Sequence, residues 1–237
     1  MENLWLIGGI VLAAATVQSL TGFGFALVTI SLLPLLMDLQ TAVPLIVLIS
    51  AAGNAILCWH YRNSVEGAMV ARLIAAALVT LPLGLWGLHY LPEQWSLRLL
   101  GGVILAYVIY DGLQFSLPPL QSPRWAYAFG AVSGVLTGAF NTGGPAVVVY
   151  GSCHRWEPEQ FKSNMPSVFL VTSLSAIALH LWQGNITPTL LQTTAWTLPF
   201  FAGGIGLGLG LSRYIDAVQF RYVVLVLLGL MALRLLA

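Results

Sequence analysis

Charged residues are scarce in this sequence. Asp, Glu, Lys and Arg together make up 7% of the 237 residues, whereas soluble domains carry roughly 25%. Hydrophobic residues make up 58%, and the mean hydropathy is +0.87. This composition excludes an ordinary soluble domain, and a formal net charge of +1 argues against a nucleic-acid partner. We therefore expect an integral membrane protein that lies in a lipid bilayer.

Cysteine is almost as rare, and the residue types of common reactive sites are dispersed. Cys58 and Cys153 have neither the spacing of metal ligands nor that of a disulfide framework. The histidines in or beside loops, His60, His89 and His154, share no metal-ligand spacing either. No nucleophile lies beside a base in the pattern of a catalytic site. The sequence therefore predicts neither an enzyme nor a bound cofactor or metal.

Long apolar runs, by contrast, fill most of the chain. They are continuous and mostly about 20 residues long, which is the length of a membrane-spanning helix and unlike the alternating pattern of a barrel strand. Two of them, 26–37 and 145–153, are too short to span. The sequence thus predicts an all-α polytopic membrane protein. The apolar runs cover residues 4–20, 26–37, 41–59, 69–90, 96–117, 124–140, 145–153, 164–182, 188–211 and 217–236.

A polar, glycine-rich interruption comes just before each short run. The first covers residues 20–25, and the second covers residues 136–145. Proline cannot continue a helix but fits in its first turn, so Pro145 predicts a helix that restarts after a break. Non-helical backbone at membrane depth is tolerated only where it is buried in protein or lines a cavity. Two such breaks in corresponding positions indicate the binding site of a transporter.

Short motifs recur in the same order along the chain. They predict two repeats, residues 1–113 and 124–237, joined by a Pro-rich linker over residues 114–123. Each repeat would consist of a broken or re-entrant helix pair followed by three transmembrane helices. The recurring motifs are Leu20-Thr21-Gly22 with Leu136-Thr137-Gly138, Val43-Pro44 with Met165-Pro166, Thr80-Leu81-Pro82 with Thr197-Leu198-Pro199, and Leu97-Arg98 with Phe220-Arg221.

The nine Lys and Arg residues test the topology. If the two helices flanking each break cross the membrane once as a single helix, the nine cations divide almost evenly between the two sides. The count then does not determine the orientation of the protein. If the chain turns back at each break, seven share one side and only Arg98 and Arg234 lie on the other. By the positive-inside rule, the seven then face the cytoplasm, both termini lie outside, and the two repeats are inverted. The seven are Arg62, Arg72, Arg124, Arg155, Lys162, Arg213 and Arg221.

We expect the two breaks to bind a small anion. A helix that begins after Gly-rich backbone presents unpaired N–H groups and the positive end of its dipole, and both favour an anion. Neutral hydroxyl and amide groups add hydrogen bonds without burying a charge, and no Lys or Arg lies near either break. The candidate substrate-binding residues are Thr21, Gly22, Phe23, Gly24, Thr137, Gly138, Asn141, Thr142, Gly143, Gly144 and Pro145.

Glycine also allows membrane helices to pack closely, and this alternative stays open for the breaks themselves. We prefer it for the glycines elsewhere in the apolar runs. These are Gly84, Gly87, Gly101, Gly102, Gly203, Gly204, Gly206, Gly208 and Gly210.

The two breaks also carry a family likeness. Its residues are Thr21-Gly22-Phe23-Gly24-Phe25 with Pro34, and Gly134 and Gly138 through Gly143-Gly144-Pro145. With these motifs the chain resembles the sulfite exporter TauE/SafE family of membrane permeases. The resemblance implies a transporter of small sulfur-containing anions, such as sulfite or organosulfonates, in the inner (cytoplasmic) membrane of a bacterium. It carries over only Gly22, Gly24, Gly138, Gly143, Gly144 and Pro145, whereas Asn141 and Thr142 rest on the physical argument above.

The sequence therefore predicts a secondary transporter that moves a small oxyanion by alternating access, with export implied by the resemblance alone. Two alternatives stay open: an anion channel with the same neutral site, and a membrane subunit that serves a partner enzyme. Coupling to a proton or a sodium ion is compatible with the sequence, and no feature indicates an oligomeric state.

Overall fold

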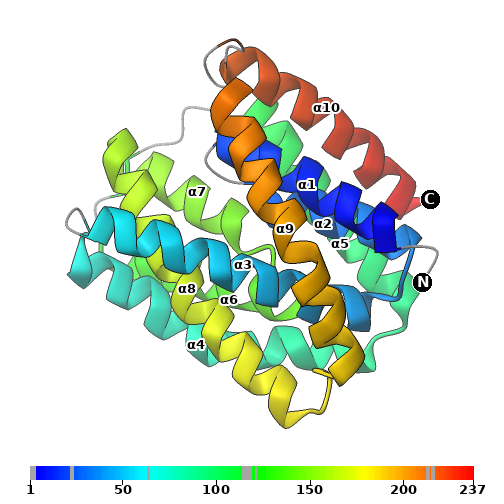
Figure 1. Cartoon of the computed structure of the whole chain (residues 1–237). Coiled ribbons are helices and arrows are strands. Elements are labelled where there is room, and N and C mark those ends of the chain that lie inside the picture. The colour runs from blue at the N-terminus through cyan, green and yellow to red at the C-terminus, as the bar shows by residue number, and fades with distance from the viewer. Residues whose placement is uncertain are drawn as a thin grey trace. The chain divides into compact units, whose positions relative to one another are not determined.

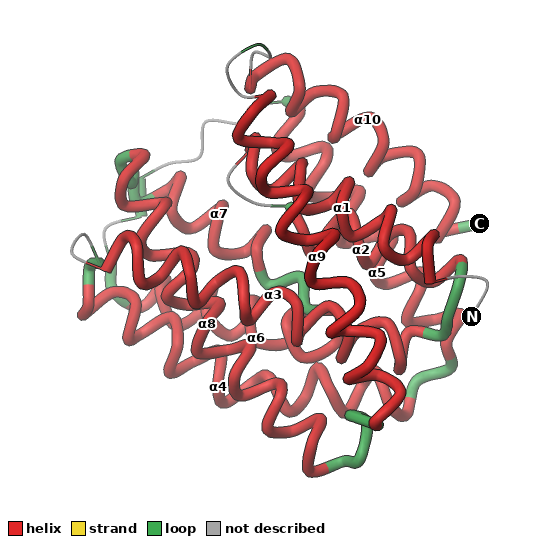
Figure 2. The backbone as a smooth tube through the Cα atoms, in the orientation of Figure 1, coloured by secondary structure: helices red, strands yellow, loops and turns green. Residues whose placement is uncertain are grey.

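The computed structural model describes residues 4–21, 24–62, 65–113, 119–120, 122–211, 214 and 217–237. Within these ranges every regular element is helical, and short loops join the helices (Figure 2). The prediction of an all-α chain is therefore confirmed. The described helices are α1 (Leu4–Thr21), α2 (Phe25–Leu32), the 3-10 turn η1 (Leu33–Leu35), α3 (Leu39–Tyr61), α4 (Gly67–Tyr90), α5 (Glu93–Gly112), α6 (Arg124–Phe140), α7 (Gly144–Cys153), α8 (Pro158–Trp182), α9 (Pro188–Leu211) and α10 (Ala217–Leu236).

Each predicted apolar run corresponds to one α-helix. Among the described residues, α3, α4, α8 and α9 are long and apolar enough to cross a membrane, and shorter apolar helices accompany them. The two short runs form α2 and α7, and each of these helices begins directly after its break.

Two helix boundaries differ from the apolar runs for local reasons. Helix α8 begins at Pro158, six residues before its run, because Glu157 and Gln160 form a capping box and Pro158 fits the first turn. Helix α2 gives way to η1 at Leu33, where Pro34 has no N–H to donate to the preceding turn.

The chain divides into two compact units, and each takes helices from both predicted repeats. Unit 1 consists of Met1–Ile46, Leu91–Phe115 and Ile186–Ala237. Unit 2 consists of Val47–Tyr90 and Ser116–Asn185. The first break therefore belongs to unit 1 and the second to unit 2, while α3 passes from one unit into the other.

In unit 1, α1 packs parallel to α9 (Figure 1). A Cβ placed on Gly204 would lie 2.3 Å from the carbonyl oxygen of Leu12, and one on Gly208 would lie 2.5 Å from the Cβ of Ser19. The hydroxyl of Thr16 donates to the carbonyl of Gly204 at 3.2 Å. Two of the α9 glycines thus serve helix packing, as predicted. For Gly203, Gly206 and Gly210 the packing prediction is wrong among the described residues, because nothing lies within 4 Å of a Cβ placed on any of them.

Unit 1 also pairs α5 with α10 in antiparallel orientation. Gly101, in the first half of α5, lies against Ala232 near the end of α10, and a Cβ placed on Gly229 would lie 3.6 Å from Val108. Because α5 begins where α10 ends, Arg98 and Arg234 lie at one end of this unit. These are the two cations that the charge count places together.

In unit 2, the corresponding parallel pair is α4 with α6. Gly130, Gly134 and Gly138 lie along one face of α6, where Cβ atoms would come within 2.4, 2.3 and 2.1 Å of the carbonyl oxygens of Leu73, Ala77 and Leu81. In return, Gly84 of α4 faces the carbonyl of Val135. Small residues of this kind let membrane helices approach closely. Gly138, a predicted site residue, therefore contacts the backbone of α4.

Helices α6 and α7 are antiparallel, so the chain turns back at the second break. The amide of Leu120, just before α6, donates to the carbonyl of Cys153 at the end of α7, at 3.1 Å. About one turn further into the pair, the rings of Phe129 and Tyr150 have centroids 5.7 Å apart. At the other end of the pair, Gly143 lies against Thr137. The break forms the tip of this hairpin.

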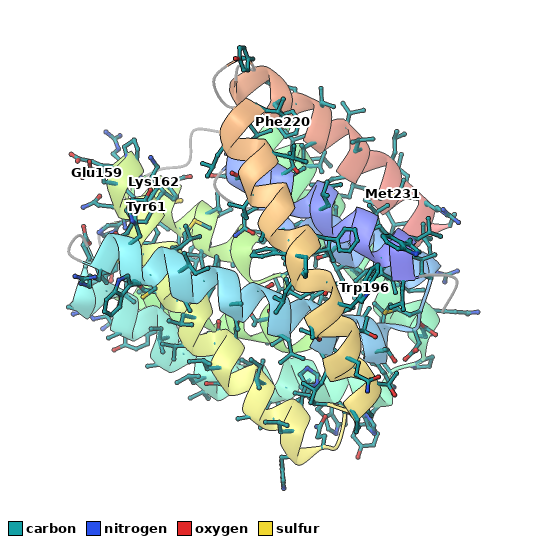
Figure 3. All side chains as sticks on the ribbon, viewed as in Figure 1. Tyr61, Glu159, Lys162, Trp196, Phe220 and Met231 are labelled. Atoms are coloured by element: carbon teal, nitrogen blue, oxygen red, sulfur yellow. The ribbon has the colours of Figure 1, made fainter. Side chains whose placement is uncertain are left out.

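The loops on one side of unit 2 gather at a polar end. The amide of Glu66 donates to Asn164 at 3.0 Å, the carboxylate of Glu66 accepts from Gln160, and the indole of Trp156 contacts Met69. Figure 3 labels Tyr61, Glu159 and Lys162 at this end. The same end holds five of the seven cations that the charge count assigns to one side: Arg62, Arg72, Arg124, Arg155 and Lys162.

Candidate functional site

The second break begins with a left-handed residue. Asn141 has φ 55° and closes α6 by donating its amide hydrogen to the carbonyl of Thr137 at 2.9 Å. Asparagine is among the few residues other than glycine that adopt this conformation readily. The side-chain amide of Asn141 donates to the hydroxyl of Ser50 on α3, 3.1 Å away. The residue therefore both ends α6 and links the break to a neighbouring helix of unit 2.

Three buried hydroxyls surround the break without a hydrogen-bond partner among the described residues. They belong to Ser133, Thr137 and Thr142, whose side chains are 0%, 3% and 1% exposed. Ser133 and Thr137 lie four residues apart, on the same face of α6. A buried polar group without a partner costs about 1–3 kcal/mol, so an unpaired set of three is unusual. We call these three residues the hydroxyl cluster.

Gly143 brings the backbone of the break against two members of the hydroxyl cluster. A Cβ at this position would lie 2.2 Å from the Oγ1 of Thr137 and 2.5 Å from the Oγ of Ser133. Its φ of −64° is open to any residue, so it is space and not backbone angle that requires glycine here. The next residue differs: the nearest neighbour to a Cβ on Gly144 is the ring of Phe169, at 3.8 Å.

Helix α7 begins directly after these hydroxyls. Gly143 is its N-cap, and Pro145 lies in its first turn, as predicted. Within the described part of the chain, the amides of Gly144 and Ala146 donate no hydrogen bond, as is usual in a first helical turn. The break thus combines free backbone donors, a helix dipole and neutral hydroxyls, and this combination suits an anion.

The first break is described only in part. Gly22 and Phe23 lie outside the described residues, as does the side chain of Thr21. Gly24 is the N-cap of α2 with φ 102°, a conformation that favours glycine. The buried hydroxyls of α2 differ from those of unit 2, because Thr29 and Ser31 donate to carbonyls of their own helix at 2.7 and 2.5 Å. That the two breaks meet stays a prediction.

Two residues of this site were not among the predicted ones. Ser133 lies in the middle of the apolar run that forms α6, and its only sequence signal is its spacing of four residues from Thr137. Ser50 lies on α3, far from the break in sequence, and carries no motif. The structure brings Ser50, Ser133, Thr137, Asn141 and Gly143 together within unit 2.

Comparison with known protein families identifies the family to which the chain belongs. The model of the sulfite exporter TauE/SafE family matches residues 6–235. No curated protein and no solved structure matches the chain. Members of this family are membrane transporters and not enzymes, and the family implies a small anionic substrate. Because the match covers nearly the full sequence, this multi-pass membrane protein belongs to the sulfite exporter TauE/SafE family of transporters.

Proposed function

We propose that the chain is a secondary transporter that exports a small sulfur-containing oxyanion, such as sulfite or an organosulfonate, across the cytoplasmic membrane of a bacterium. The observation that carries the proposal is the hydroxyl cluster at the tip of the α6–α7 hairpin. Its three oxygens are buried and have no partner among the described residues, directly beside the N-terminus of α7.

An oxyanion in the break would supply the missing hydrogen-bond acceptors. Hydrogen bonds to a charged group contribute about 1.5–3 kcal/mol each. The dipole of α7 adds about 0.3–2 kcal/mol, depending on burial. Thr137 and Thr142 donate from their hydroxyls, and Gly144 donates from its amide. Asn141 keeps the break in shape through its bond to Ser50.

The absence of a cation from the break suits release as well as binding. Residues 125–153 contain no Lys or Arg. A fixed positive charge would bind an anion more tightly, but it would be costly to bury while the site is empty. A transporter must let its substrate go on the far side, so donors without charge favour turnover.

Alternating access follows from the proposed inverted repeats. Each unit contains one parallel pair, α1 with α9 and α4 with α6, in which the first helix of one repeat packs on the fourth helix of the other. If all five helices of a repeat reverse direction in turn, as α6 and α7 do, the odd number inverts the second repeat. Repeats of this kind enclose a substrate near the membrane midplane, and rocking exposes it to either side. Thr21, Gly22, Phe23 and Gly24 would complete the site from the first break.

The test is a substrate screen on the purified, reconstituted protein. We expect sulfite, short sulfonates or both to raise the unfolding temperature and to show saturable uptake with counterflow. The variant Thr137→Val keeps the shape of the side chain but removes its hydroxyl, and it should weaken binding about tenfold or more. Non-saturating flux without counterflow would instead indicate a channel. Wild-type affinity in Thr137→Val would rule out the hydroxyl cluster as the site.

A further inference from the structure

This inference rests on the proposed function and concerns the charge of the substrate. We infer that the site selects oxyanions by charge: it accepts monoanions, such as hydrogen sulfite and organosulfonates, and rejects dianions, such as sulfate and fully ionised sulfite. The chemical class of the substrate is thus narrower than that of small sulfur oxyanions.

The first argument is the position of the cations. Among the described side chains, no Lys or Arg is buried. Only Arg72 is even half-buried, and it lies near the start of α4, at the polar end of unit 2. The remaining described cations are exposed, and they are Arg62, Arg98, Arg124, Arg155, Lys162 and Arg234.

The second argument is the way in which the energies scale with charge. The free energy needed to move an ion out of water grows with the square of its charge, so it is roughly four times as large for a dianion as for a monoanion. Neutral donors offset a smaller share of this free energy for a dianion, because the attraction between an ion and a dipole grows only in proportion to the charge. The hydroxyl cluster and the first turn of α7 can therefore offset the transfer of one charge far better than that of two.

The third argument is the chemistry of the hydroxyls themselves. A Ser or Thr hydroxyl is one donor and also an acceptor with two lone pairs. The cluster can therefore accept a hydrogen bond from the O–H of a protonated oxyanion while the amides of Gly144 and Ala146 donate hydrogen bonds to its other oxygens. Ser133 and Thr137 lie close enough to a single point at Gly143 to act together. Hydrogen sulfite carries such a proton and fully ionised sulfite does not, so this contact favours the monoanion of sulfite; for organosulfonates, which have no acidic proton, the selection rests on charge alone.

The experiment compares three anions in proteoliposomes over a range of pH. Methanesulfonate is a monoanion and sulfate a dianion throughout, while sulfite loses its second proton near neutral pH. We expect methanesulfonate counterflow to stay nearly constant, sulfite flux to fall as pH rises through that ionisation, and sulfate to be carried at least about tenfold more slowly. Methanesulfonate controls for any titration of the protein itself.

Two outcomes contradict the inference in different ways. Sulfate flux equal to methanesulfonate flux, or sulfite flux that rises with pH, would overturn charge selection and leave the proposed transport of sulfur oxyanions in place. If none of the three anions moves or raises the unfolding temperature, both proposals fail. Thr137→Val locates the effect: it should lower methanesulfonate affinity about tenfold or more. If it leaves that affinity unchanged, the selection does not arise at the hydroxyl cluster.

Discussion

Gly143 and Gly144 are adjacent and identical, yet their surroundings give them different roles. A methyl group on Gly143 would displace the hydroxyls of Thr137 and Ser133, whereas one on Gly144 would meet only ordinary contact distances. We therefore predict that Gly143→Ala lowers substrate affinity about tenfold or more, because the displaced donors no longer reach the anion. The affinities of wild type and variant are compared by ligand-induced shifts in unfolding temperature.

Gly144→Ala is the matched control, since it adds the same methyl group one residue later. Its backbone amide, the group proposed to donate to the anion, is unchanged, so this variant should bind substrate as the wild type does and insert normally into the membrane. Equal losses in the two variants would mean that the break tolerates no added volume, and the specific role assigned to the hydroxyls would be wrong.

Asn141 makes two separable contributions to the break. Asn141→Gly keeps the left-handed backbone and loses only the bond to Ser50, so it should destabilise the protein by about 0.5–1.5 kcal/mol. Asn141→Ala also loses the bond and, unlike glycine, keeps a Cβ in the left-handed conformation without the polar side chain that lets asparagine adopt it, which adds about 1–2 kcal/mol relative to Asn141→Gly. Unfolding in detergent measures both. If the alanine variant is as stable as the glycine variant, the backbone angle is not what selects asparagine.

For single residues, part of the candidate site could be predicted from the sequence. Thr137, Asn141, Thr142 and Gly143 stand out because polar residues and helix breakers coincide in an apolar run. Ser133 does not, because one serine inside a membrane helix is common and only the hairpin places it at Gly143. Gly138 shows the opposite difficulty, since a glycine that packs helices and one that opens a site look the same in sequence.

Among the helices, the contact between α4 and α6 depends on Gly134. A Cβ there would lie 2.3 Å from both the carbonyl of Ala77 and the hydroxyl of Thr80, and that hydroxyl already donates to Ala131 at 2.7 Å. Gly134→Ala should therefore separate the two helices and cost about 1–3 kcal/mol or more. The measurement is the unfolding temperature of the purified protein.

The control for this prediction is Gly206→Ala on the exposed face of α9. Nothing lies within 4 Å of a Cβ at Gly206, so the substitution should be neutral or stabilise by up to about 1 kcal/mol through helix propensity. Similar losses in both variants would argue that any alanine is harmful in these glycine-rich helices.

Helix positions could be predicted well because membrane helices are read from continuous apolar runs. The predicted start of α8 was wrong because apolar runs do not reveal a polar first turn. The first turns of α8 are polar, and only the capping box of Glu157 and Gln160 marks where the helix begins. Helix partners could not be predicted, since glycines on α6 and α9 indicate close packing but not the helix that they approach. The exchange of helices between repeats is therefore visible only in the structure.

For the molecule as a whole, the distribution of cations predicts its orientation in the membrane. Five of the cations assigned to the cytoplasm share the polar end of unit 2, as a chain that turns back at its second break requires. We predict that a reporter fused after Ala237 lies outside the cytoplasm, and that one inserted at residues 183–187 does too. A reporter at residues 155–157 should read cytoplasmic. If the reporter after Ala237 reads cytoplasmic, the charge count is wrong.

The pairing of α1 with α9 also bears on how the protein is made. Unit 1 needs residues from Ile186 onward, so its first helix leaves the ribosome long before its partner exists. During most of translation, the face of α1 that α9 later covers meets lipid or the insertion machinery instead. A chain that stalls before Pro188 would therefore leave that face of α1 without its partner helix.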